Sequence, residues 1–153
     1  MATDGAKAAA AAAEFGVEGR WPVLERHRVR WAECDMYAHV NHAAYLTLCE
    51  DLRVAHWVSL GGRFEPGEPG PVVARLEARY LRPLGFGDEV ALTLRPGAMR
   101  RTSFTHEYAI WRGGLAFSCK AVLVLVRHGG GERVPIPPEA RRLLKEQGAV
   151  EEG

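Results

Sequence analysis

The sequence predicts an α+β fold in which a five-stranded antiparallel sheet wraps around one long central helix. Two observations lead to this prediction. Residues 42–60 are apolar on nearly every helical face, and such a helix is buried on all sides. Four strand-like segments joined by short turns follow the helix, and one precedes it. One sheet cannot cover everything, so we expect the outer sheet face and the helix ends to meet another subunit.

The 153 residues suit one domain, expected over residues 21–148. Residues 1–20, rich in Ala and Gly, predict a flexible tail or frayed helix, and residues 149–153 a second tail. A net charge of +1 argues against nucleic acid as a partner, and no apolar run reaches the roughly 18 residues of a membrane span. Three scattered cysteines favour a reducing, cytoplasmic location without disulfides or zinc.

Each element has its own signal along the chain. Residues 23–31 alternate in polarity like a strand, and Gly61-Gly62 ends the helix before a loop that reaches Pro71. Residues 121–126 are apolar without interruption, which predicts a central strand covered on both faces. The four strands after the helix are expected at 72–82, 89–95, 100–111 and 115–127, followed by a short amphipathic helix at 137–147.

A crowded polar segment leads directly into the long helix. It reads Asp35-Met36-Tyr37-Ala38-His39-Val40-Asn41-His42. The first backbone N–H groups of a helix have no partner within the helix and attract negative charge. An acid at this position can face the same small volume as those donors. We therefore predict an active site where the chain enters the helix, with a helix cap or Asx turn as the alternative role of Asp35.

The strand ending in Trp31-Ala32-Glu33-Cys34-Asp35, followed by Met36-Tyr37-Ala38-His39-Val40-Asn41 and the apolar helix, resembles the hotdog-fold thioesterases of the 4-hydroxybenzoyl-CoA thioesterase type. Two further segments match in the same order, Tyr80–Val90 and Arg100–Phe104. The resemblance spans about Val23 to Val126. It implies an acyl-CoA thioesterase that needs no metal and no cofactor besides the coenzyme A of its substrate. It also implies a homodimer or a homotetramer.

The resemblance also implies roles for the residues at the helix entrance. Asp35 would be the nucleophile or the general base, and a backbone N–H in the first helical turn, placed by spacing at His42, would bind the oxyanion. Asn41 would orient water, the acid or the thioester, or cap the helix. His39 would hold the loop and line the subunit interface, or transfer a proton. The family often has a second Asn where this chain has His42, so fine positioning differs here.

Substrate contacts and a helical acid complete the implied site. Glu50 would orient water or substrate, with an ion pair to Arg53 as the alternative. Guanidinium groups suit the phosphates of coenzyme A, although a solvated basic surface explains the same residues. The candidates for substrate contact are His39, Tyr45, Arg82, Arg100, Arg101, Thr102 and Ser103.

Other functions fit parts of the pattern. An acyl carrier protein could bear the thioester, because it presents the same phosphopantetheine arm. A hotdog-fold hydratase would need a longer signature that is absent here. A non-catalytic acyl-CoA-binding protein would keep the helix and arginines but would not need Asp35. Aliphatic and aromatic acyl groups both fit the sequence.

Overall fold

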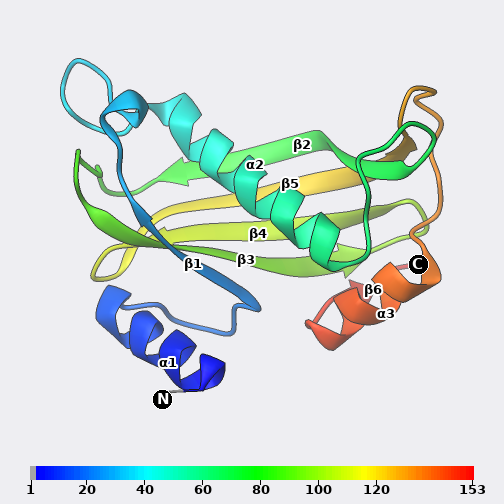
Figure 1. Ribbon diagram of the computed structural model, residues 1–153, viewed down its shortest axis with the longest axis horizontal. Helices are drawn as coiled ribbons and strands as arrows, with labels where there is room; N and C mark the ends of the chain where they lie inside the picture. The colour runs from blue at the N-terminus through cyan, green and yellow to red at the C-terminus, as the bar shows by residue number, and fades with distance from the viewer. Residues whose placement is uncertain (1–2) are drawn as a thin grey trace.

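The computed structural model describes residues 3–153 and contains one six-stranded sheet with helices on both of its faces (Figure 1). Five antiparallel strands lie in the order β1-β3-β4-β5-β2, which confirms the expected antiparallel sheet. A short sixth strand extends it, because β6 pairs in parallel with the end of β3. The strands are β1 Val23–Arg28, β2 Pro69–Tyr80, β3 Glu89–Met99, β4 Ser103–Trp111, β5 Leu115–Arg127 and β6 Val150–Glu151.

The longest helix, α2 (His42–Ser59), lies across one face of the sheet (Figure 1). It buries one stripe, made of Tyr45, Leu48, Cys49, Leu52, His56 and Trp57. The opposite side is open, with Val54 41% and Val58 54% exposed. The expectation of burial on every side is therefore wrong for the single chain, because the sheet covers only one side of α2. Within residues 3–153, no helix is both long and apolar enough to cross a membrane.

Two further helices accompany α2. The first, α1 (Asp4–Phe15), lies in the segment expected to be a flexible tail or a frayed helix; residues 1 and 2 are outside the described part. Phe15 is only 4% exposed and packs with Ala91, Ala109 and Trp111 on the sheet face away from α2. One aromatic side chain thus anchors the Ala-rich helix. The other helix, α3 (Pro138–Glu146), was expected near this position and adds Leu144 to the main core.

Strand β3 continues through Pro96-Gly97, where the sequence predicts an end. The register of β3 against β4 shifts between Pro96 and Met99. The Ala98 N–H donates to the Thr105 hydroxyl at 2.8 Å. A Cβ at Gly97 would lie 2.4 Å from that same oxygen, so a larger residue would displace the Thr105 hydroxyl and break this bond. The irregularity lets the strand tolerate a proline.

A buried chain of hydrogen bonds joins α2, β4 and α3. Arg53 donates to the Tyr108 hydroxyl at 3.4 Å, and that hydroxyl lies 3.0 Å from His106 Nδ1. His106 Nε2 is 3.0 Å from His56 Nδ1, and His56 Nε2 is 2.6 Å from Gln147 Oε1. Because Gln147 Oε1 can only accept, donation runs from Tyr108 to His106, from His106 to His56 and from His56 to Gln147. Each imidazole then holds one proton and is neutral.

The neutral histidine pair predicts a loss of stability in mild acid. Burial lowers the pKa of His56, and burial with the neighbouring His56 and Arg53 lowers the pKa of His106 well below its ordinary value. In the unfolded chain both rings bind protons near pH 6.5, so the unfolded state takes up more protons as the pH falls. We expect full stability above about pH 6.5 and a loss of up to about 1.4 kcal/mol per pH unit per histidine below it.

Urea unfolding between pH 7.5 and 5.5 checks this. His106→Gln should flatten the pH dependence, whereas His128→Gln, at an exposed position, should retain it. A wild-type midpoint that does not change over this range would contradict the prediction.

Candidate active site

Asp35 lies in a tight loop between β1 and α2, after a short 3₁₀ turn (Trp31–Glu33). Its N–H donates to the His39 carbonyl at 2.8 Å, and its carbonyl accepts from the Ala38 N–H at 3.0 Å. Oδ1 of the carboxylate accepts from the N–H of Tyr37 at 2.9 Å and of His39 at 3.4 Å. These bonds form the Asx turn that the sequence allows. Oδ2 has no hydrogen-bond partner among the described residues, so one oxygen is held and the other is available.

Glu33 anchors the base of this loop. Its side chain is buried, with Oε2 2.9 Å from both the Arg30 N–H and His27 Nε2, and Oε1 about 3 Å from the Arg30 guanidinium. Burial opposes ionisation, but the Arg30 backbone and the side chains of His27 and Arg30 hold the pKa of the carboxyl below its usual value. The Glu33 carbonyl accepts from the Asn41 N–H at 2.8 Å. Glu33 therefore ties β1 to the start of α2, through its carboxylate on one side and its backbone carbonyl on the other.

Asn41 caps α2 and leaves one N–H group available. Its side-chain oxygen accepts from the Ala43 N–H at 2.9 Å, and its carbonyl accepts from the Ala44 N–H at 2.9 Å. The His42 N–H has no acceptor within residues 3–153. A free N–H at the positive end of an 18-residue helix can donate a hydrogen bond to an oxygen of a ligand.

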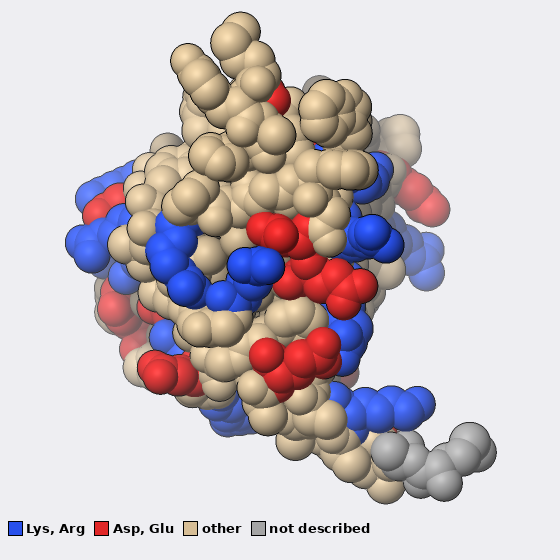
Figure 2. Space-filling view, turned by 90° about the vertical axis from the view of Figure 1, so that its left-hand side faces the viewer, with Lys and Arg blue, Asp and Glu red and all other residues tan. Residues whose placement is uncertain are grey.

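The helix entrance and the end of β2 enclose a hollow of about 370 Å³. Five of the predicted site residues line it: Asp35, His39, His42, Tyr45 and Arg82. The other lining residues are Val40, Tyr80, Leu81 and Pro83. Arg82 has no acidic side chain within 4 Å in the described part of the chain, whereas its neighbour Arg112 pairs with Asp88 at 3.4 Å. Figure 2 shows this end of the molecule, where charges of both signs are interspersed.

The remaining predicted residues lie elsewhere. Glu50 is exposed on α2 two turns beyond the entrance and forms the predicted ion pair with Arg53 at 3.5 Å. Arg100 and Ser103 line a separate hollow of about 480 Å³ on the other face of the sheet. The carbonyls of Arg101 and Thr102 accept backbone N–H groups of Ile136 and Leu125.

The sheet register explains this separation. Ser103 and Val72 both pair with Val124, so β4 begins level with the start of β2. The candidate site lies at the other end of β2, eight residues away at Tyr80, which is about 26 Å along a strand. In a single chain, the segment from Arg100 to Ser103 does not reach Asp35.

Tyr80 is a site residue that the sequence interpretation did not select. Its hydroxyl donates to the His42 carbonyl at 3.0 Å. Its ring meets Tyr45 and Phe117, each with centroids 5.2 Å apart. Tyr80 opens one of the segments that carry the resemblance, but only the place where β2 ends against α2 gives it this role.

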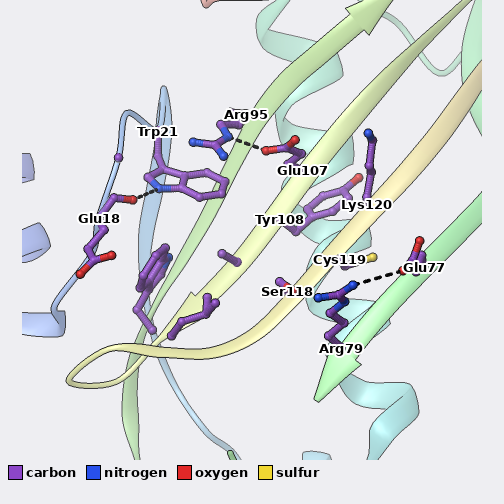
Figure 3. A pocket seen from close by; sticks show the side chains of 14 residues that line it. Glu18, Trp21, Glu77, Arg79, Arg95, Glu107, Tyr108, Ser118, Cys119 and Lys120 are labelled. Atoms are coloured by element: carbon purple, nitrogen blue, oxygen red, sulfur yellow. Dashed lines mark hydrogen bonds and ion pairs between the residues drawn. The ribbon is translucent and has the colours of Figure 1, made fainter. Parts of the chain in front are cut away.

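A larger hollow than the one at Asp35, about 590 Å³, lies on the sheet face away from α2 (Figure 3). Arg95, Glu107, Lys120 and Glu77 cross it from β3 to β2 as paired neighbours of alternating sign. Arg95 contacts Glu107 at 2.6 Å and stacks 4.1 Å above the ring of Trp21. These charges offset one another, so the hollow offers no excess positive charge to a phosphate. The smaller hollow at Asp35 remains the candidate site.

Comparison with known proteins identifies the family. The thioesterase-like superfamily matches residues 29–144. The chain belongs to this superfamily. A solved thioesterase-superfamily structure from Jannaschia sp. CCS1 is 31% identical, with a TM-score of 0.83 and 92% of each chain covered. A thioesterase from Thermus thermophilus, complexed with coenzyme A and Zn, is 31% identical, with a TM-score of 0.69, 82% of this chain and 99% of that chain covered.

A curated relative from Bacillus subtilis, the uncharacterized protein YsmA, is 26% identical over 118 residues, which is 76% of this chain and 80% of that protein. The resemblance to hotdog-fold thioesterases is thereby confirmed. The residues that the structure describes contain no group of three or more His, Cys, Asp or Glu side chains that could hold a metal ion.

The loop carries local strain that predicts a stabilising substitution. Ala38 has φ +60°, a left-handed conformation that costs a residue with a Cβ roughly 1–2 kcal/mol. Glycine removes that cost, but it also makes the unfolded chain more flexible, which lowers the stability by roughly 0.4–1 kcal/mol. We expect Ala38→Gly to raise the free energy of unfolding by about 0.5–1 kcal/mol in urea titrations.

The matched control is Ala43→Gly in the first turn of α2, where the same exchange should cost up to about 1 kcal/mol. A destabilised Ala38→Gly protein would contradict the assigned backbone conformation.

Proposed function

We propose that this superfamily member hydrolyses an acyl-CoA thioester to a free acid and coenzyme A. One observation supports this above all others. The free Oδ2 of Asp35 and the free N–H of His42 belong to residues that line the same hollow. A carboxylate and an oxyanion donor are the two groups that thioester hydrolysis needs.

Asp35 can act by either of two routes. As a general base, it takes a proton from water while the water oxygen bonds to the thioester carbonyl carbon. As a nucleophile, it forms an acyl-carboxylate anhydride that water then cleaves. In both routes the carbonyl oxygen becomes an oxyanion that accepts from the His42 N–H, and the sulfur of coenzyme A leaves as the thiolate. Asn41 has both oxygens engaged as a cap, so it acts by positioning.

Binding of coenzyme A would use Arg82 at the rim of the hollow. Arg82 lines it and has no acidic partner within 4 Å among the described residues. A guanidinium in this setting suits a phosphate. Tyr45 is buried beneath the hollow and stacks on Phe117 at 4.7 Å, so it shapes the floor. His39 is exposed at the edge, where it can contact the substrate.

We further propose that the working enzyme is a homodimer joined along β2. This 12-residue edge strand has no partner on its outer side in the described chain and exposes Val72, Val73 and Leu76. An antiparallel pair of β2 strands across a twofold axis would bring the start of the partner strand to the Tyr80 end of this one. The partner's Arg100 and the partner's Ser103 would then approach this chain's Asp35 end. Stacking of two such dimers is the tetrameric alternative.

Asp35→Asn should abolish thioester hydrolysis while leaving the fold intact. Asparagine retains Oδ1 as the acceptor of the Asx turn but cannot serve as base or nucleophile, so we expect a loss of roughly 10²–10⁴-fold in kcat. Thiol release from short, medium, long and aryl acyl-CoA thioesters measures it. The matched control Asp4→Asn, exposed in α1, should keep full activity. Near-wild-type turnover by a folded Asp35→Asn protein would overturn the proposed mechanism.

Leu76→Asp should break the dimer. A carboxylate on each copy would be buried and would face another negative charge at the edge, so we expect a monomer by light scattering and a parallel loss of hydrolysis. The control Val150→Asp places the same charge at an exposed apolar position on β6 and should remain dimeric. A monomeric, active wild-type protein would exclude the β2 dimer.

A further inference from the structure

We propose that Tyr80 is a positioning residue for the reaction: its hydroxyl holds the first turn of α2 so that the His42 N–H is oriented toward the thioester carbonyl. This inference rests on the proposed function, because it concerns the oxyanion donor of that site. The contact that carries it is the hydrogen bond from the Tyr80 hydroxyl to the His42 carbonyl, 3.0 Å long.

The ring of Tyr80 is held firmly enough to place its hydroxyl. Tyr80 is the last residue of β2 and pairs with Phe117 of β5. Its ring packs edge-on against Tyr45, with an interplanar angle of 84°, and against Phe117 at 61°. Tyr45 and Phe117 are themselves stacked. Contacts with these two stacked rings limit the rotation of the Tyr80 ring, although Tyr80 as a whole is 48% exposed.

The start of α2 needs such a support. Helix ends fray, and the capping bonds of Asn41 engage the N–H groups of Ala43 and Ala44, not that of His42. The side chain of His42 is exposed, and no bond to it is seen in the described part of the chain. The His42 N–H lies in the same planar peptide unit as the Asn41 carbonyl, which the Ala44 N–H holds. The Tyr80 hydroxyl holds the next peptide unit through the His42 carbonyl, so the units on both sides of the His42 Cα are restrained and the N–H keeps its direction.

The same contact links the site to the free edge of the sheet. Tyr80 belongs to β2, which is the strand proposed to pair with a second copy. Ordering of β2 by a partner would then order Tyr80 and, through it, the oxyanion donor. A donor displaced by even 1 Å from the developing oxyanion can lower the rate by as much as about 10²-fold, so a single hydroxyl can matter here.

Tyr80→Phe tests the inference, because it keeps the ring and removes only the hydroxyl. We expect kcat to fall about tenfold with KM changed less than about twofold, and the same factor for aliphatic and aryl acyl-CoA thioesters. Thr47→Val is the control. It removes another hydroxyl that contacts a carbonyl of the first helical turn, that of Ala43, at 3.5 Å, and should leave kcat within about twofold.

Amide hydrogen exchange gives a readout that does not depend on activity. Exchange of the Ala43 to Leu46 amides should be faster in Tyr80→Phe than in wild type, while the oligomeric state is unchanged. Unchanged exchange, unchanged kcat, or a rise in KM alone would overturn the role of Tyr80. If the wild-type protein hydrolyses no thioester, the proposed function itself fails. If the wild-type protein is active and Asp35→Asn is inactive, the proposed function stands, and a Tyr80→Phe protein with wild-type kinetics then refutes only the positioning role of Tyr80.

Discussion

The packing of α2 against the sheet determines where every candidate group lies. The buried stripe from Tyr45 to Trp57 sets the rotation of the helix about its axis, because those side chains must meet the apolar face of β3, β4 and β5. Once that rotation is fixed, the first turn of α2 must emerge beside the ends of β1 and β2. The Asp35 loop and the Tyr80 side chain then meet at the same point. The geometry of the site is thus a consequence of core packing along the length of α2.

At the helix entrance, electrostatics and hydrogen-bond satisfaction act in the same direction. The positive end of α2 favours anions, so it stabilises an oxyanion near the His42 N–H. The loop holds Oδ1 of the Asp35 carboxylate in backbone hydrogen bonds. Glu33, paired with Arg30 and hydrogen-bonded to His27, supports the loop from below. Oδ2 of Asp35 is the carboxylate oxygen of the loop that stays open to a substrate or a water.

The sequence predicted some features closely and missed others for physical reasons. The end of α2 could be predicted from the sequence because Gly61-Gly62 follows an apolar run. The expected helix 42–60 differs from the observed His42–Ser59 by one residue. The packing of α1 against the sheet could not be predicted, because it depends on one side chain, Phe15, at the end of an alanine-rich segment. The position of Arg100 to Ser103 relative to Asp35 depends on strand register, and so does the role of Tyr80. Local patterns identify elements, but register decides which of their ends meet.

The open features of the single chain have one common explanation. An unpaired 12-residue edge strand with apolar side chains is prone to uncontrolled pairing unless something covers it. The open side of α2 exposes Val54 and Val58, which lie one turn apart and form an apolar strip. Contiguous apolar surface of this kind is typical of a surface that another molecule covers. Arg100 and Ser103, two of the expected substrate contacts, lie far from Asp35 within one chain. A twofold axis beside β2 would cover the edge, shield the open side of the helix and bring Arg100 of the partner subunit and Ser103 of the partner subunit toward the acid. A monomer would leave three features unexplained: the uncovered edge, the exposed apolar side of α2 and the distance of Arg100 and Ser103 from Asp35. Because a single twofold axis accounts for all three features, it is the strongest physical reason to expect a site shared between two copies.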